Sequence, residues 1–151
     1  MWIDTNVHLE RIPSDPESVL QRAKEASVSV IATGLHSRQW KWLAKQRPTL
    51  RAYGLHPSLI RHTRDLKDLP SYLDTDKKAH LGEIGLDYRD SLASDRRRQY
   101  RVFSDQLDMS KQYRRAVIIH AVKSHSDVLR ALKEHKVDRF VIHAFSGSKE
   151  I

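Results

Sequence analysis

Glutamate and histidine side chains follow apolar stretches at three places in this chain, and together they could bind a divalent metal ion. Glu83 lies in a strand-like segment between two glycines, and His120 and His143 each end an apolar run. A buried, ionised carboxylate is costly unless it is paired or bound to a metal, whereas a lone histidine at a strand end is usually a hydrogen-bonded core or rim residue. Two imidazoles and one carboxylate on neighbouring strands can converge on one ion. The set therefore predicts a metal centre.

Two further histidines have placements that allow a functional role. His8 follows Asn6 by two residues, so both side chains would lie on one side of an extended chain. An amide oxygen is a weaker ligand than imidazole for transition metals, and taken alone this segment is more typical of a structural element. His56 precedes Pro57, and its imidazole could hydrogen-bond a phosphate or a leaving group, or serve only the loop structure. We treat the remaining histidines as surface residues: His36, His62, His80, His125 and His135.

The composition is that of one globular domain. The chain has 151 residues, of which 39% are hydrophobic, and none of its apolar runs approaches the roughly 18 residues of a membrane span. It has no cysteine and no secretory leader pattern, which fits a cytoplasmic protein without disulfides or thiolate ligands. A net charge of +8 makes a polyanion such as nucleic acid a candidate partner, although a solvated basic surface explains it too.

The elements that must position these side chains alternate between strand and helix patterns. Such alternation predicts a parallel sheet, either an open doubly wound sheet or a barrel. Functional residues follow most of the strands, which favours a (β/α) barrel of the TIM type, because an open sheet concentrates them at one switch point. We expect strands at residues 2–8, 28–34, 50–55, 79–86, 116–121 and 139–144, and helices at about 15–26, 38–46 with Ser37 as its cap, within 66–73, 94–113 and 126–135.

The motifs, taken in order, resemble the TatD family of metal-dependent deoxyribonucleases, which are amidohydrolase-like barrels. The matching segments cover essentially the whole chain: Asp4-Thr5-x-x-His8-Leu9, Gly54-x-His56-Pro57, Gly82-Glu83-Ile84-Gly85-Leu86-Asp87-Tyr88, Ile119-His120 and His143-x-Phe145-Ser146-Gly147.

The resemblance implies a barrel that holds one or two divalent ions, Mg²⁺, Mn²⁺ or Zn²⁺, and uses a metal-activated water to hydrolyse DNA phosphodiesters. His8 and Glu83 would serve one ion, with Asn6 as a weak ligand. Glu83, His120 and His143 would serve the other. The catalytic candidates are Glu83 and His56, and the substrate-binding candidates are His56 and Asp87.

The chain departs from the family pattern at three points. Asn6 stands where the family has histidine, and Ala121-Val122 replaces a Ser-Arg pair. The sequence also covers only about six of the eight strands of such a barrel, so we expect a C-terminally truncated domain over residues 1–151, without the aspartate that follows the eighth strand. Any metal should then be held chiefly by Glu83, His120 and His143.

The expected open barrel edges could pair two copies of the chain into a homo-oligomer. An alternative function also stays open, in which the chain is a catalytically impaired relative that acts as a nucleic-acid- or protein-binding module.

Overall fold

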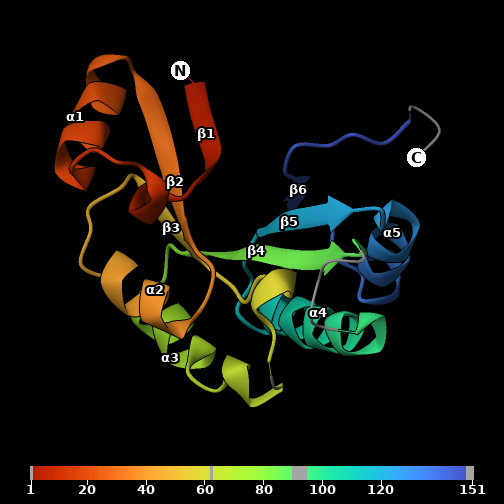
Figure 1. Ribbon diagram of the computed structural model, residues 1–151. Coiled ribbons are helices and arrows are strands. Elements are labelled where there is room, and N and C mark those ends of the chain that lie inside the picture. Colours follow the sequence, from red (N-terminus) through yellow and green to blue (C-terminus); the bar gives the residue numbers. More distant parts are fainter. Residues whose placement is uncertain (1, 62, 90–94, 149–151) are drawn as a thin grey trace.

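The computed structural model describes residues 2–61, 63–89 and 95–148. Six parallel strands form one sheet, and their order in the sheet is their order in the chain. In Figure 1 the strand direction turns progressively from β1 to β5, and the helices lie along the outside of the curve. The strands are β1 (Trp2–Val7), β2 (Val28–Gly34), β3 (Leu50–Tyr53), β4 (His80–Asp87), β5 (Val117–Val122) and β6 (Phe140–Ile142).

Each pair of consecutive strands is joined by a crossover that contains a helix, which confirms the predicted barrel-type topology. A doubly wound sheet would reverse its strand order at a switch point, and the described sheet does not. The α-helices are α1 (Pro16–Glu25), α2 (Ser37–Leu43), α3 (Leu69–Thr75), α4 (Arg96–Gln112) and α5 (His125–Glu134), with short 3-10 helices η1 (Leu9–Arg11), η2 (Pro57–Leu59) and η3 (Thr63–Leu66).

Local sequence explains where α1 begins. Asp15 accepts a hydrogen bond from the backbone N–H of Ser18 at 2.9 Å, and Pro16 takes the first position of α1. The expectation that Ser37 caps the second helix is wrong, because Ser37 lies inside α2. That helix also ends earlier than predicted, at Leu43, whose carbonyl accepts a hydrogen bond from the Arg51 side chain at 3.3 Å.

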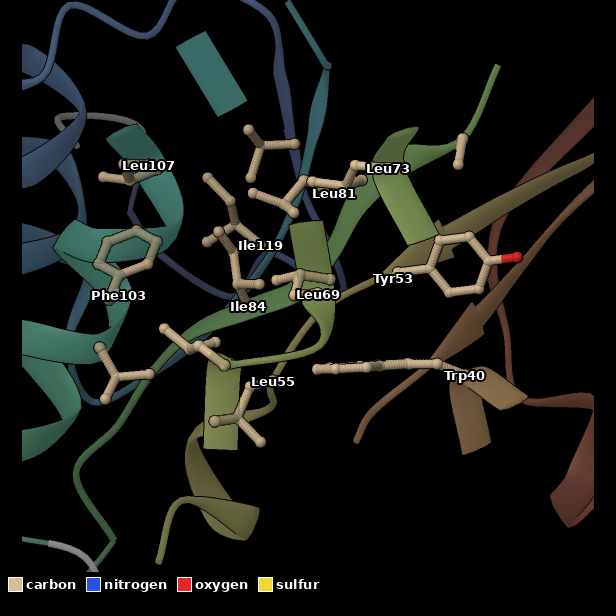
Figure 2. Close-up of a cluster of buried hydrophobic side chains, with 14 of the residues drawn as sticks. Trp40, Tyr53, Leu55, Leu69, Leu73, Leu81, Ile84, Phe103, Leu107 and Ile119 are labelled. Atoms are coloured by element: carbon tan, nitrogen blue, oxygen red, sulfur yellow. The ribbon is translucent and has the colours of Figure 1, made fainter. Parts of the chain in front are cut away.

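The core lies between the sheet and helices α2 to α5. Trp40 is fully buried, and its indole N–H donates to the carbonyls of Gly34 and Gly54, both at 3.0 Å. These bonds join the ends of β2 and β3 to α2. Figure 2 shows the buried cluster that continues across the sheet, including Leu55, Leu69, Leu81, Ile84, Phe103, Leu107 and Ile119.

The two outer strands of the sheet carry exposed apolar side chains. Trp2 and Ile3 of β1 are 78% and 53% exposed, and Phe140 and Val141 of β6 are 40% and 44% exposed. The described helices include none that is both long and apolar enough to cross a membrane.

Candidate metal centre

The predicted site residues meet in a cavity at the carboxyl ends of the strands. Its volume is about 430 Å³, and five of the predicted residues line it: His8, His56, Glu83, His120 and His143. Asn6 and Asp87 do not line the cavity but contact residues that do. The topology explains this convergence, because parallel strands in sequential order end at the same edge of the sheet.

Glu83 lies at the centre of the cluster, with a side chain that is 3% exposed. Its carboxylate is 2.9 Å from Nδ1 of His120 and 3.3 Å from Nε2 of His8, and it accepts a hydrogen bond from the Asn6 amide at 3.1 Å. Burial raises the pKa of the Glu83 carboxyl, but the hydrogen bonds from His120 and His8 outweigh it and hold that pKa far below its usual range. Glu83 is therefore an ionised carboxylate at neutral pH.

A glycine lets β4 approach β5 closely enough for this contact. Gly85 has φ +143° and pairs with His120 across the two strands, and a Cβ at this position would lie only 2.0 Å from the His120 carbonyl oxygen. No other residue type fits there without moving one strand. The spacing that places Glu83 beside His120 thus depends on Gly85.

The imidazole of His120 bridges two carboxylates. Nδ1 faces Glu83 and Nε2 faces Asp87, each at 2.9 Å. Burial lowers the pKa of His120, but its hydrogen bonds to the two carboxylates outweigh burial and raise that pKa. Burial likewise raises the pKa of Asp87, whereas hydrogen bonds from Arg89 and His120 lower it to about 2.

His8 has the hydrogen-bond pattern of a metal-binding histidine. Its Nδ1 lies 3.4 Å from the backbone carbonyl of Thr33, and its Nε2 faces Glu83. An N–H that donates to a carbonyl fixes the tautomer and leaves the other ring nitrogen free for a metal. The hydrogen bond to Glu83 raises the pKa of His8.

His56 has the opposite pattern. Its Nδ1 accepts a hydrogen bond from the backbone N–H of Ser58 at 3.2 Å and lies 2.7 Å from the Ser58 hydroxyl. Burial, followed by the nearby charge of His120, lowers the pKa of His56 to about 4. The neutral imidazole therefore carries its proton on Nε2, which lies 4.0 Å from Glu83. That nitrogen is a hydrogen-bond donor rather than a free ligand.

The chemistry of this donor set fits a divalent cation. Among the described residues, the ligand atoms of His56, Glu83 and His120 all lie within 4.8 Å of one another, and Nε2 of His8 lies 3.3 Å from Glu83. With His56 assigned as a donor, the potential ligands are Glu83, His120 and His8. The side-chain oxygen of Asn6 is also buried without a hydrogen-bond partner, as expected of an atom that can accept a cation. His143 follows β6 and lines the same cavity, but its side chain is exposed and outside this group, so its role as a ligand stays a prediction.

Several supporting residues were not predicted. Gln99 and Gln106 of α4 are buried. Gln99 hydrogen-bonds the backbone of Asp87, which is a site residue, and Gln106 hydrogen-bonds the backbone of Leu55, which precedes His56. The available signal was their spacing of seven residues, which places both on one face of a helix among apolar residues.

Four of the histidines that we expected at the surface are half-buried instead, namely His36, His80, His125 and His135, whereas His62 lies outside the described residues.

Comparison with known proteins agrees with this geometry. A family model described as TatD related DNase matches residues 3–151. The chain is 29% identical to an uncharacterized metal-dependent hydrolase, YabD, of Bacillus subtilis, covering all of this chain and 63% of that protein. It is 28% identical to the 3'-5' ssDNA/RNA exonuclease TatD of Pantoea ananatis, covering 98% of this chain and 60% of that protein.

A solved structure resembles it closely as well. The crystal structure of YJJV, a TatD homolog from Escherichia coli K12, superposes with a TM-score of 0.85 at 31% identity, covering 97% of this chain and 61% of that chain. The chain spans about three fifths of the length of the relatives named here.

Proposed function

The chain belongs to the family of TatD-related DNases, and from that premise we propose that residues 1–151 form a metal-dependent hydrolase domain that cleaves phosphodiester bonds of nucleic acid. The observation that carries this proposal is the buried Glu83 carboxylate, which is contacted by His8, directly after β1, and by His120 of β5. A carboxylate with two imidazoles at the mouth of a cavity is a donor set of hydrolytic metal sites.

Glu83, His8 and His120 would hold the ion, with His143 and the Asn6 oxygen as additional donors. Asp87 orients His120 through Nε2, and the Thr33 carbonyl orients His8 through Nδ1. Both of these ring nitrogens face away from Glu83. A divalent cation, when bound, supplies positive charge that offsets the charge on phosphoryl oxygens and makes a water molecule more acidic. Its identity among Mg²⁺, Mn²⁺ and Zn²⁺ is part of the test below.

His56 acts on the substrate in this proposal. Because Ser58 keeps Nδ1 as an acceptor, the Nε2–H of His56 points toward the Glu83 and His120 side of the cavity. It donates a hydrogen bond to a phosphoryl oxygen or to the departing oxygen, where negative charge develops. This assigns His56 to substrate binding and catalysis rather than to the metal.

The substrate proposed is DNA, with RNA as a second polymer of the same phosphodiester chemistry. A named relative acts on single-stranded DNA and RNA, and the net charge of +8 favours association with a polyanion. We propose a cytoplasmic location, which the absence of cysteine fits without determining the redox compartment. The exposed apolar side chains of β1 and β6 support pairing of two copies at the sheet edges, which light scattering would detect.

The test is cleavage of end-labelled single-stranded DNA and RNA with each of the three metals and with a chelator. We expect cleavage that needs a metal and is lost in Glu83→Gln. The control is His135→Gln, which removes the contact of His135 with Asp108 of α4 and should retain the cleavage activity. Equal activity in Glu83→Gln would contradict the proposal. Salt-sensitive binding without cleavage under every metal would instead favour a nucleic-acid-binding module.

A further inference from the structure

An arginine follows each of the first four strands, at the same end of the strands as the candidate metal centre. Arg11 follows β1 and Arg89 follows β4, and both line the metal cavity. Arg38 follows β2 and Arg61 follows β3, and these two line a second hollow of about 430 Å³. The segments that follow these strands, including η1 and the first turn of α2, therefore present guanidinium groups at two neighbouring hollows.

Residues that are adjacent in sequence line the second hollow and the metal cavity. Leu35 lines the metal cavity and the next residue, His36, lines the second hollow. In the loop after β3, His56 lines the metal cavity, whereas Leu55 and Leu59 line the second hollow. Two loops thus separate the hollows, so one extended chain molecule could occupy both.

The charges of Arg38 and Arg61 act together in this hollow. Burial lowers the pKa of His36, and the charge of Arg38 lowers it further; the charge of Glu10 opposes this, and Arg61 adds the smallest lowering effect. Both arginine side chains are exposed, and neither forms an ion pair with a residue in the described part of the chain. Asp65 also lines the hollow, where its carboxylate accepts the backbone N–H of Arg61 at 3.0 Å.

The arginines in the metal cavity are engaged differently. Arg89 pairs with Asp87, which in turn contacts His120, and Arg11 lies 3.9 Å from the Glu10 carboxylate. Their charge is partly offset by these carboxylates. Of these four arginines, Arg38 and Arg61 are therefore the two that form no ion pair with a described residue, so an anion can bind their guanidinium groups without displacing a described carboxylate partner.

We propose that the hollow between the loops after β2 and β3 is a phosphate subsite, in which Arg38 and Arg61 bind the backbone phosphate next to the one at the metal cavity. Leu55 and Leu59 give this hollow an apolar wall for the adjoining sugar or base. The inference rests on the proposed function, because it concerns a neighbouring nucleotide of the same strand. Its ligand is a single-stranded polynucleotide rather than a mononucleotide.

The test measures binding in the presence of a chelator, so that cleavage does not contribute. The full chain is titrated with a fluorescent dinucleotide and with a longer thymidine strand over a range of salt concentrations. For the Arg38→Gln/Arg61→Gln variant, we expect weaker binding of the longer strand and a salt dependence reduced by about 0.7 in log–log slope per lost phosphate contact. The matched control is Lys45→Gln/Arg47→Gln, which removes the same charge before β3, at the opposite end of the strands.

The Arg38→Lys/Arg61→Lys variant should recover most of the salt slope, because it keeps the charge and loses only the planar geometry. If the wild-type chain cleaves nucleic acid but Arg38→Gln/Arg61→Gln binds the longer strand as the control does, the subsite is wrong and the proposed function stands. If no metal supports cleavage but the arginine variant alone loses strand binding, the proposed function fails and the subsite stands.

Discussion

The side-chain amide of Gln99 makes two hydrogen bonds to the backbone of Asp87, accepting from its N–H at 2.7 Å and donating to its carbonyl at 2.8 Å. Gln106 makes the same pair of bonds to Leu55, at 2.7 and 3.2 Å. The two glutamines lie seven residues apart on the buried face of α4. One helix therefore fixes the chain at the end of β4 and at the residue before His56.

We expect Gln99→Leu to destabilise the fold, because it leaves the N–H and the carbonyl of Asp87 buried without these partners. Each unsatisfied group costs about 1–3 kcal/mol, and urea denaturation would measure the loss. Gln112→Leu serves as the control, since Gln112 is exposed at the end of the same helix. Equal stability of the two variants would show that the Gln99 bonds contribute nothing net.

Asp87→Asn should weaken metal binding without removing a proposed ligand. Asp87 contacts the Nε2 of His120, and loss of such an orienting carboxylate typically lowers metal affinity about 10–100-fold. Titration calorimetry with Zn²⁺ or Mn²⁺ would measure it. Asp127→Asn is the matched control, because Asp127 pairs with Tyr88 and Arg130 away from the cavity. An unchanged affinity in Asp87→Asn would argue against the orienting role.

His56 should be neutral at pH 7 in the metal-free protein, with its proton on Nε2. Its folded-state pKa of about 4 lies below the ordinary value of 6.5, so its contribution to stability is present above pH 6.5 and is lost as the pH falls through 4. Nitrogen-15 NMR of the imidazole would report both the tautomer and the midpoint. A protonated Nδ1 at neutral pH would refute the assignment of His56 as a donor to substrate.

Metal binding should become weaker as the pH falls. Hydrogen bonds to Glu83 help to raise the pKa of both His8 and His120, so protons compete with an incoming cation for these imidazoles up to a higher pH than for free histidine. Calorimetry in buffers of different ionisation enthalpy would count the protons released. We expect proton release on binding to grow as the pH is lowered, and a metal affinity that does not change with pH would argue against His8 and His120 as ligands.

The sequence was sufficient to predict the strand order and the convergence of most candidate site residues at one end of the strands. Strand β2 lies at the expected residues 28–34, because its β-branched run and terminal glycine are local signals. The side chains of Glu83 and His120 meet as predicted, since parallel strands in sequential order end together. These predictions needed only periodicity and the position of polar residues at strand ends.

Contacts that depend on side-chain direction could not be predicted in this way. His56 rather than His143 lies beside Glu83 and His120, and this depends on the turn at Pro57 and on Ser58 holding the ring. The burial of Gln99 was also difficult to predict from the sequence, because a polar residue on a helix is exposed in most proteins. The side chain of Gln99 bonds the backbone of Asp87, and every residue has a backbone, so no particular residue type in the sequence identifies the partner.

The sequential strand order makes the site modular. Each strand and the loop after it contribute their own functional side chains, so a substitution at one strand end leaves the contacts between the other strands intact. The chain already illustrates this independence: β1 carries asparagine at position 6, yet Glu83 of β4 and His120 of β5 keep their 2.9 Å contact. Such a scaffold can change its metal preference or its substrate one loop at a time, without repacking the core.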